Sequence, residues 1–436
     1  MNNLNFLVDV LKESPVFKTL EKNVKPGRTV CASGLSTINK SNIIYALCRL
    51  KGVTAFCLAS DEKEAQTLCN DLSCMGLRAY VYPVRDFNFL DFQSRSHEYE
   101  HARLKVLLKL LNHECDVAIA CVDAAAQLTV PRNVLEQSVI EFEEGRELSL
   151  EKATKALTLL GYERFDAVEG SGQFSLRGGI LDFFMPDSDY PVRCEFWGDE
   201  ITDLSYFDIE TQRRFKKADK ITLSPSTEIV IEDRAALADK IEHKAKLLRS
   251  KNSVKAKEKL FSEAELIRSG AMIANADKFI NQIYDKPESL FDYLDRNTLV
   301  FASEFTAIQE RGKSMDFISN ETLMQGFEDG TLCRGFDRFA LTFNECTEFL
   351  QSHGTIVLEN FVHGSMPIKL SEIISFSTKQ LSAWGGSYKQ LKEDVDGLFT
   401  PESKGVIFAG TERAAKNLCD TFNADGINAV YSEGAD

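Results

Sequence analysis

A short segment near the N-terminus has nearly the spacing with which a P-loop binds nucleotide phosphates. The residues Gly34-Leu-Ser-Thr-Ile-Asn39-Lys40-Ser41 follow an apolar run and differ at one position from Gly-x4-Gly-Lys-Ser/Thr. In that motif the second glycine lets backbone amides approach the phosphates, and the lysine and the hydroxyl bind phosphate and magnesium. Asn39 adds a side chain at this crowded position, although asparagine tolerates the left-handed backbone region. We therefore predict a loop that keeps its shape and has lost its phosphate site.

Nucleotide hydrolysis also requires acidic side chains after a second buried strand, one to organise Mg²⁺ and one to orient water. The best candidate is the end of Leu299-Val-Phe-Ala-Ser303-Glu304, where Ser303 stands in the place expected for an aspartate. The chain also shows only one complete sheet of this kind, so no second lobe supplies an arginine finger. We therefore predict no catalytic residues, no cofactor and no metal for this chain.

A second group of residues suited to binding lies between residues 172 and 200. Arg177 precedes the pair Gly178-Gly179, which is typical of a turn or a bulge, and Asp182 follows in an apolar strand. An exposed arginine beside aromatic residues can anchor a protein interface through charge-assisted hydrogen bonds and stacking. The alternative for Arg177 is an ion pair with Asp182 or Glu195 across the sheet.

Hydrophobic periodicity predicts the elements that position these residues. Between residues 28 and 126, wholly apolar strands alternate with amphipathic helices, which indicates a parallel sheet covered on both faces. From Phe174 to Phe207 the apolar residues partly alternate with polar ones, and this predicts an antiparallel meander. We also expect a long helical stretch, a buried strand, and two late strands that join the first sheet or build another, at residues 232–294, 297–302, 355–358 and 405–409.

Composition limits the class of protein. The 436 residues, 44% of them hydrophobic, are enough for two to four domains. The eleven cysteines are scattered without a Cys-x-x-Cys pair, and the six histidines show no ligand spacing. We therefore expect reduced cysteines that act as small core residues in a cytoplasmic protein.

The charge balance argues against a large autonomous DNA-binding surface, because the net charge is −15. The densest basic segment, from Lys240 to Lys259, alternates with Glu and Ala and is interpreted as a solvated helix face. No apolar run reaches the roughly 18 residues that span a bilayer, and the N-terminus lacks the basic start of a secretory signal. We therefore predict no membrane partner.

The order of Arg177, the paired glycines, Asp182 and the turn Gly198-Asp199-Glu200 resembles the small domain shared by UvrB and the bacterial transcription-repair coupling factors. In that family the domain is a docking surface for UvrA. Residues 20 to about 380 resemble UvrB in order, but UvrB keeps an intact P-loop and a long aromatic hairpin that clamps DNA. Here the segment 82–92 passes to the next helix without room for that hairpin. The chain is thus similar to the N-terminal UvrB-homology module of the coupling factors (the Mfd family), and we expect it to be truncated.

The resemblance implies which residues would contact UvrA. The matching positions are Arg177 and Arg164, with Arg193 as a third basic candidate whose alternative is a surface salt bridge to Glu195 or Asp199. Phe183 and Phe184 are adjacent, so a strand buries one and exposes the other, and the exposed one is the interface candidate. The altered nucleotide site, which we expect to be inactive, comprises Gly34, Asn39, Lys40, Ser41, Ser303 and Glu304.

The function implied by the resemblance is a non-catalytic module that recruits UvrA and restrains a motor in transcription-coupled nucleotide excision repair. The parent protein would be an ATP-dependent DNA translocase that displaces stalled RNA polymerase. ATP and Mg²⁺ would belong to its missing motor domains, and RNA polymerase and DNA would be partners through the parent. One alternative is an enzyme, a UvrB-like ATP-dependent DNA-loading subunit, and another is a structural spacer that binds nothing.

The expected fold is α/β, a helicase-like (RecA-type) parallel sheet covered by helices with an inserted small α+β antiparallel domain. We predict the first part of the helicase-like lobe at residues 1–126 and the UvrA-docking domain at 127–215. The second part of the lobe, with the long helical stretch, is predicted at 216–375. The start of a further α/β domain is predicted at 376–436.

Overall fold

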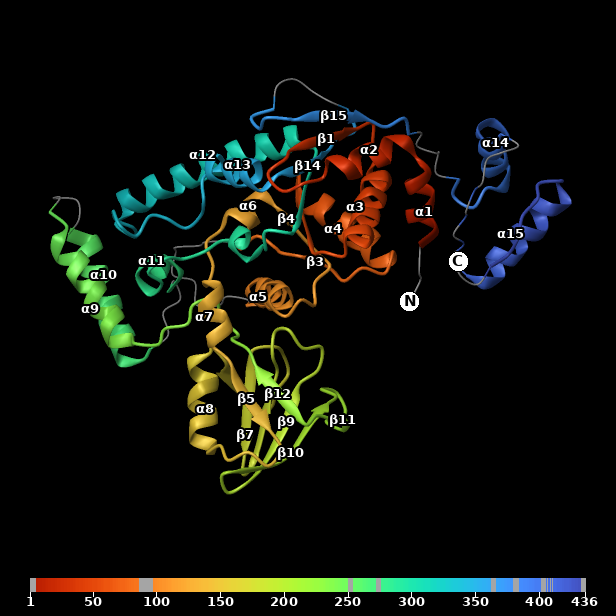
Figure 1. Cartoon of the computed structure of the whole chain (residues 1–436). Helices are drawn as coiled ribbons and strands as arrows, with labels where there is room; N and C mark the ends of the chain where they lie inside the picture. The colour runs from red at the N-terminus through yellow and green to blue at the C-terminus, as the bar shows by residue number, and fades with distance from the viewer. Residues whose placement is uncertain are drawn as a thin grey trace.

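The chain is described by a computed structural model, and Figure 1 shows its architecture. A lobe built on a large sheet carries a smaller sheet unit below it and a helical hairpin, α9 and α10, at the left. Two further helices, α14 and α15, lie at the right. Each described helix is too short or too polar to traverse a bilayer. The described residues are 5–85, 97–249, 254–271, 276–361, 366–378, 384–400, 405, 407, 409 and 411–432.

Seven strands, all parallel to their neighbours, form the sheet of the lobe in the order β15-β1-β14-β13-β2-β4-β3. Every residue of β1, β2, β4 and β14 is buried, as expected where helices cover both faces. The predicted parallel sheet is thus confirmed, and the strand predicted at 355–358 joins it between β1 and β13. The strands are β1 Val30–Ser33, β2 Ala55–Ala59, β3 Ala79–Val81, β4 Val117–Cys121, β13 Leu299–Ser303, β14 Thr355–Leu358 and β15 Glu372–Ser375.

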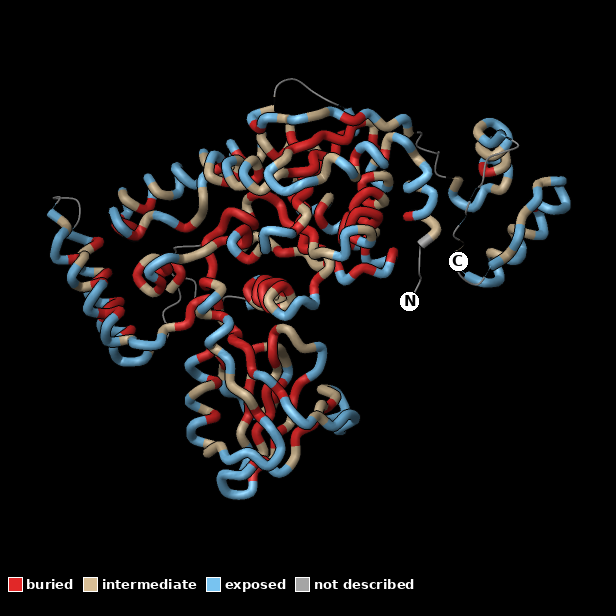
Figure 2. The backbone as a smooth tube through the Cα atoms, in the orientation of Figure 1, coloured by how far each residue is buried: buried red, intermediate tan, exposed pale blue. Residues whose placement is uncertain are grey.

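Two hydrophobic clusters lie on opposite faces of this sheet, because successive strand residues point to opposite sides. Val30 and Ala32 of β1 belong to the cluster that includes α2, α3 and α4, whereas Cys31 belongs to the one that includes α5, α6, α12 and α13. Figure 2 shows this concentration of buried residues around the sheet. The helices are α1 Asn5–Glu13, α2 Pro15–Asn23, α3 Thr37–Lys51, α4 Glu62–Cys74, α5 Glu98–Leu111, α6 Val122–Ala126, α12 Phe305–Asp329 and α13 Phe343–His353.

The smaller unit, called the β unit (residues 140–223), consists of a six-stranded sheet in the order β11-β10-β9-β8-β7-β6 and a two-stranded sheet, β12-β5. Strands β7 to β11 pair antiparallel in sequence order, which confirms the predicted meander. One face of the six-stranded sheet packs with α8 and the β5–β12 pair around a single apolar cluster. The elements are β5 Ile140–Glu143, α8 Leu150–Leu159, β6 Glu163–Arg164, β7 Gln173–Arg177, β8 Ile180–Phe183, β9 Val192–Trp197, β10 Glu200–Phe207, β11 Arg214–Lys217 and β12 Lys220–Leu223.

The structure differs from the sequence predictions in two places. Strand β12 pairs with β5, so the β unit extends beyond the predicted boundary at residue 215. The helical stretch predicted over 232–294 is not continuous, because α10 ends at a glycine with φ +83° (Gly270), and the described residues 276–286 form short helical turns before Pro287. The helices outside both sheets are α7 Arg132–Gln137, α9 Arg234–Leu247, α10 Val254–Ser269, α11 Ile280–Ile283, α14 Tyr388–Leu398 and α15 Glu412–Ala424, with 3-10 turns at Ala276–Phe279 and Leu290–Tyr293.

Two predictions fall wholly or partly outside the described residues. The strand predicted at 405–409 includes positions 406 and 408, which are not among them. The segment expected to lack a DNA-clamping hairpin includes residues 86–92, which are also outside the described part. Both stay predictions.

Candidate functional site

The altered P-loop residues and the acidic strand end do come together, at the carboxyl edge of the parallel sheet. Lys40, on the first turns of α3, is only 3% exposed. Its Nζ donates to Glu304 Oε1 at 2.5 Å and to Ser303 Oγ at 3.0 Å, and it lies 3.5 Å from Glu64 Oε1. The Ser303 hydroxyl in turn donates to Glu64. The lysine is therefore held by two carboxylates and a hydroxyl of the chain itself.

The loop before α3 is too short to form a phosphate-binding nest. Helix α3 begins at Thr37, so Asn39 and Lys40 are already helical, and the Lys40 amide donates to the Ser36 carbonyl at 3.1 Å. The Gly34 and Leu35 amides donate to the carbonyls of residues 360 and 359. A P-loop requires such amides to point at the phosphates. In this loop the amides of Gly34, Leu35 and Lys40 are satisfied within the protein, and the predicted preserved loop shape is wrong because the helix starts earlier.

The other residues of this site have structural partners as well. The side-chain amide of Asn39 donates to Ser36 Oγ at 2.8 Å, and the buried Ser41 hydroxyl donates to Asp71 at 2.9 Å. Gly34 has φ +78°, and a Cβ there would lie 2.0 Å from the carbonyl oxygen of Phe376. This glycine is thus required by the close approach of the chain after β15, with no phosphate involved.

A third carboxyl group, Glu359, lies at the end of β14 beside this cluster. Burial, together with the nearby Glu304, raises the pKa of its carboxyl from 4.5 to about 7, although a hydrogen bond from the Phe305 amide at 2.7 Å favours the charged form. The pocket that would receive phosphates is therefore surrounded by acidic groups. Among the described residues, no three His, Cys, Asp or Glu side chains form a group that could hold a metal ion.

The β unit presents one face of its six-stranded sheet away from its core. Register pairs Ser175 with Asp182, Asp182 with Arg193 and Arg193 with Ser205, and these residues alternate with the core side chains. Arg177 and Glu195 lie one pair further along on the same face, and Trp197 follows Glu195 by two residues on β9. We call it the open face, defined by residues 175, 177, 180, 182, 193, 195, 197, 203 and 205.

A buried aspartate organises the arginines of the open face. Asp182 is 1% exposed and accepts two hydrogen bonds from Arg193, at 2.7 and 2.8 Å, and one from Arg177 at 2.8 Å. Arg193 also donates to Gln212 and lies 4.3 Å from the Phe207 ring centroid, so it is mostly enclosed. Arg177 is half exposed, with 51% of its side chain in solvent. Since a guanidinium has five N–H donors, Arg177 is both oriented by Asp182 and able to donate to a partner.

The remaining predicted contact residues have different surroundings. Phe183 is fully buried with its ring 5.0 Å from that of Phe142, so it is the buried member of the predicted pair and is not available to a partner. Phe184 is half buried and is the one that stays available. Arg164 is exposed on the edge strand β6, but its register partner is the core residue Phe174, which separates it from the rows of the open face. The ion pair considered for Arg177 is present, and that of Arg193 goes to Asp182 rather than to the two carboxylates predicted.

Sequence reasoning missed the most exposed aromatic residue of the β unit. Trp197 ends β9 on the open face and is 82% exposed. The turn that follows begins at Gly198, which has φ +64°. A large aromatic side chain left in water on a rigid sheet is typical of an interface anchor. The alternation of β9 already placed Trp197 on the side of Arg193, and this was the signal available in the sequence.

The β unit is joined to the lobe around α5. Arg103 of α5 is fully buried and donates to Glu228 at 2.6 Å and to Gln127 at 2.8 Å, which lie on the two chain segments that connect the β unit to the lobe. Its guanidinium lies 4.2 Å from the Tyr82 ring centroid. This buried network ties both connections to one helix, so it fixes how the β unit sits on the lobe.

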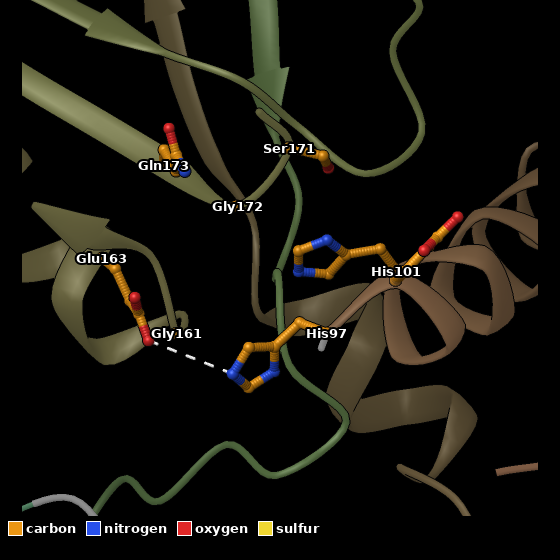
Figure 3. A pocket seen from close by; sticks show the side chains of 8 residues that line it. His97, His101, Gly161, Glu163, Ser171, Gly172 and Gln173 are labelled. Atoms are coloured by element: carbon orange, nitrogen blue, oxygen red, sulfur yellow. Dashed lines mark ion pairs between the residues drawn. The ribbon is translucent and has the colours of Figure 1, made fainter. Parts of the chain in front are cut away.

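A cavity of 350 Å³ lies at the same junction, between α5 and the β unit. Figure 3 shows His97 and His101 directed from the start of α5 toward Glu163 and Gly172. His97 Nδ1 donates a 3.0 Å hydrogen bond to the Glu100 carboxylate, which raises the pKa of His97, whereas burial lowers the pKa of His101. Gly172 packs closely here, since a Cβ would lie 2.6 Å from the His101 ring. The cavity therefore belongs to the packing of the junction.

Comparisons with known proteins agree with this division of the chain. The family described as UvrB interaction domain matches residues 140–229, which include the whole β unit. The transcription-repair-coupling factor of Bacillus subtilis (strain 168) is 26% identical over 428 residues, which cover 95% of this chain and 36% of that relative. That of Staphylococcus epidermidis (strain ATCC 35984) is 24% identical over 371 residues (80% and 30%), and that of Staphylococcus aureus (strain MRSA252) 21% over 426 residues (95% and 36%). The chain spans about a third of the length of these relatives.

Proposed function

Because this chain matches the N-terminal module of the transcription-repair-coupling factors, we propose that it is a non-catalytic module that recruits UvrA in transcription-coupled nucleotide excision repair. The open face of the β unit binds UvrA. The observation that carries the proposal is the pairing of a half-exposed Arg177, held by buried Asp182, with the exposed Trp197 on one rigid face. Such an arrangement gives a partner one oriented cation and one large apolar anchor.

The open face is suited to binding because its geometry is fixed before the partner arrives. Arg193, which also donates to Gln212, binds Asp182 from the side opposite Arg177. Because Asp182 is fixed in this way, the Arg177 guanidinium loses little freedom on binding a partner. Glu195 forms an ion pair with Arg214 on the same face, so both charges lie close to Arg177 and Arg193. A UvrA surface that offers a carboxylate to Arg177 and an apolar pocket to Trp197 is therefore expected.

The experiment is a calorimetric titration of UvrA into the chain and its variants. We expect Arg177→Ala and Trp197→Ala each to weaken binding at least tenfold, about 1.4 kcal/mol or more, without lowering thermal stability. Lys155→Ala is the matched control, since this exposed residue also has one carboxylate partner but lies on α8, which covers the other face. Unchanged affinity for both open-face variants, or an equal loss in the control, contradicts the proposal.

The nucleotide site is proposed to be inactive, with no ATP or Mg²⁺ bound by this chain. The support is the three-residue loop before α3, its satisfied amides, and the carboxylates around Lys40. The rival function is a UvrB-like ATP-dependent DNA-loading enzyme. Calorimetry with Mg-ATP separates the two, because micromolar binding that is abolished by Lys40→Ala favours the enzyme.

In the longer protein, we propose that this module restrains an ATP-dependent DNA translocase until stalled RNA polymerase is engaged. The support is the similarity to coupling factors, of which this chain covers about a third. All eleven cysteines are free, as in proteins of reducing compartments, which supports a cytoplasmic location. The test is the ATPase rate of the full-length protein with and without this module, and an unchanged rate contradicts restraint.

A further inference from the structure

The α9–α10 hairpin carries a charge opposite to that of the chain as a whole. Between residues 240 and 259 there are eight lysines and arginines against two glutamates, in a protein of net charge −15. Figure 1 shows the hairpin at the left edge of the molecule, and Figure 2 shows most of its outer surface exposed. An acidic protein does not need a cationic projection for solubility. We therefore expect this one to bind a ligand of negative charge.

The hairpin is rigid enough to present these charges in a fixed pattern. Apolar residues of α9 and α10, with Phe279 and Phe336 from neighbouring segments, form a separate hydrophobic cluster at its centre. The two helices pack antiparallel along most of their length, so their outer side chains form two rows. The members of the central cluster on the two helices are Leu237, Ala238, Ile241, Ala245, Ala256, Leu260, Ala264 and Ile267.

Three acidic residues of the hairpin are paired near its base. Arg268 pairs with Asp239 at 2.8 Å and with Glu242 at 2.7 Å, and the buried Glu263 pairs with Lys278 at 2.5 Å. These two cations lie outside the 240–259 segment. Near the tip, Lys246 shares Glu242 with Arg268, and the exposed Glu258 lies one helical turn from Lys255, so the lysines and arginines still outnumber the acids there.

The cations nearest the tip are in solvent. Lys246 is 64% exposed, and Arg249 and Lys255 are exposed on either side of the connection between the helices. The end of α12, which carries Glu328 and Asp329, lies beside Lys255, since a Cβ at Gly330 would be 3.0 Å from the Lys255 Cβ. These acids are the neighbours that would oppose an anionic ligand.

We propose that the tip of the α9–α10 hairpin, defined by Lys246, Arg249 and Lys255, binds the phosphate backbone of double-stranded DNA without reading its sequence. The choice of DNA among polyanions rests on the proposed function. Duplex DNA carries one phosphate per about 1.7 Å of axis, so three cations on a rigid projection can each meet a phosphate and release counterions. One aromatic residue lies beside these three cations, since the Lys246 ammonium is 6.0 Å from the ring centroid of Phe261, which is 37% exposed.

The test is fluorescence anisotropy of the whole chain with two unrelated 20-base-pair duplexes between 25 and 200 mM salt. We expect equal affinity for both sequences and a slope of log K against log salt of about −3, for three phosphate contacts. The triple variant Lys246→Glu/Arg249→Glu/Lys255→Glu should lose at least tenfold in affinity at 50 mM salt and flatten the slope. Glu328→Gln/Asp329→Asn should strengthen binding a few-fold.

A matched control changes three exposed lysines elsewhere, Lys22→Glu/Lys63→Glu/Lys313→Glu, and should keep most of the affinity. Equal loss in this control, no binding by the wild-type chain at 25 mM salt, or no loss in the tip variant overturns the proposal. Binding of the tip to vesicles of 30% phosphatidylserine in phosphatidylcholine, with none to DNA, also overturns it. UvrA titration on the tip variant should be unchanged, which separates failure here from failure of the proposed function.

Discussion

Replacing Lys40 with methionine should destabilise the lobe, which is the opposite of what a working P-loop predicts. Methionine keeps the length of the apolar stem and removes only the ammonium group. In this chain that group faces Glu304, Ser303 and Glu64, all at distances of 3.5 Å or less. In an ATP site the same change would remove a phosphate ligand and leave the empty fold nearly intact.

The size of the effect follows from how buried the charges are. Removing one partner of a buried ion pair costs about 3–5 kcal/mol, because the remaining charge is left desolvated. Here the side chains of Glu64 and Glu304 are 15% and 30% exposed, so water solvates part of the remaining charge. We therefore expect a loss at or below the lower end of that range, about 2–3 kcal/mol. Adding Glu304→Gln to Lys40→Met should restore much of it, because one uncompensated charge disappears.

The assay combines urea unfolding followed by far-UV circular dichroism with hydrogen exchange of peptides from β1 and β13. Exchange is needed because a chain of several units need not unfold in one step. With a denaturant slope of about 3 kcal/mol/M, the expected loss lowers the midpoint of the lobe transition by roughly 1 M. An unchanged midpoint and unchanged exchange in both strands would refute the view that Lys40 has become a structural cation.

Three further changes probe the same lobe. In the folded chain the pKa of Glu359 is about 7, against 4.5 when unfolded. Between these values the folded state keeps a proton that the unfolded state loses, so stability should fall as pH rises from about 5 to 7. The wild-type chain should lose up to about 3 kcal/mol of unfolding free energy between pH 5 and pH 8, and Glu359→Gln should abolish that loss. The measurement is the urea midpoint of both chains across this pH range. Arg103→Met should cost about 3 kcal/mol, because the buried Glu228 loses its closest cation and keeps Arg85 and the Thr129 hydroxyl. Arg103→Met/Glu228→Gln should cost less, and equal losses would argue against a buried pair. Gly34→Ala should cost about 2 kcal/mol or more without any nucleotide present, whereas a silent change would show that the chain near Phe376 yields.

The sequence predicted the main sheet and the meander because local rules decide both. Wholly apolar strands such as Val117–Cys121 are buried on both faces whatever surrounds them, and the alternation around Arg193 is a property of strand geometry. The meeting of Lys40 with Ser303 and Glu304 was also predictable, since carboxyl ends of parallel strands share one edge of a sheet. These inferences need only the order of apolar and polar residues.

What the sequence did not predict depends on contacts between distant residues. Nothing near Thr37 in the sequence shows that the loop amides pair with residues 359 and 360, which lie more than three hundred positions away. The burial of Phe183 rather than Phe184 depends on Phe142, which comes from the separate β5–β12 sheet. Strand β15 is mostly exposed and charged at its start, so its pattern does not stand out as a parallel strand.

Two buried ionic networks, one around Lys40 and one around Arg103, hold the parts of this chain in fixed positions. At the sheet edge, two carboxylates hold Lys40 at the position where a helicase lobe would respond to nucleotide, and the proposed inactive site would drive no conformational change there. At the junction, Arg103 holds both connections of the β unit to α5, so the open face keeps one orientation relative to the lobe. A partner that binds the open face therefore meets the same surface whatever the nucleotide concentration. Under the proposed function, switching of UvrA recruitment would then come from covering or uncovering that face.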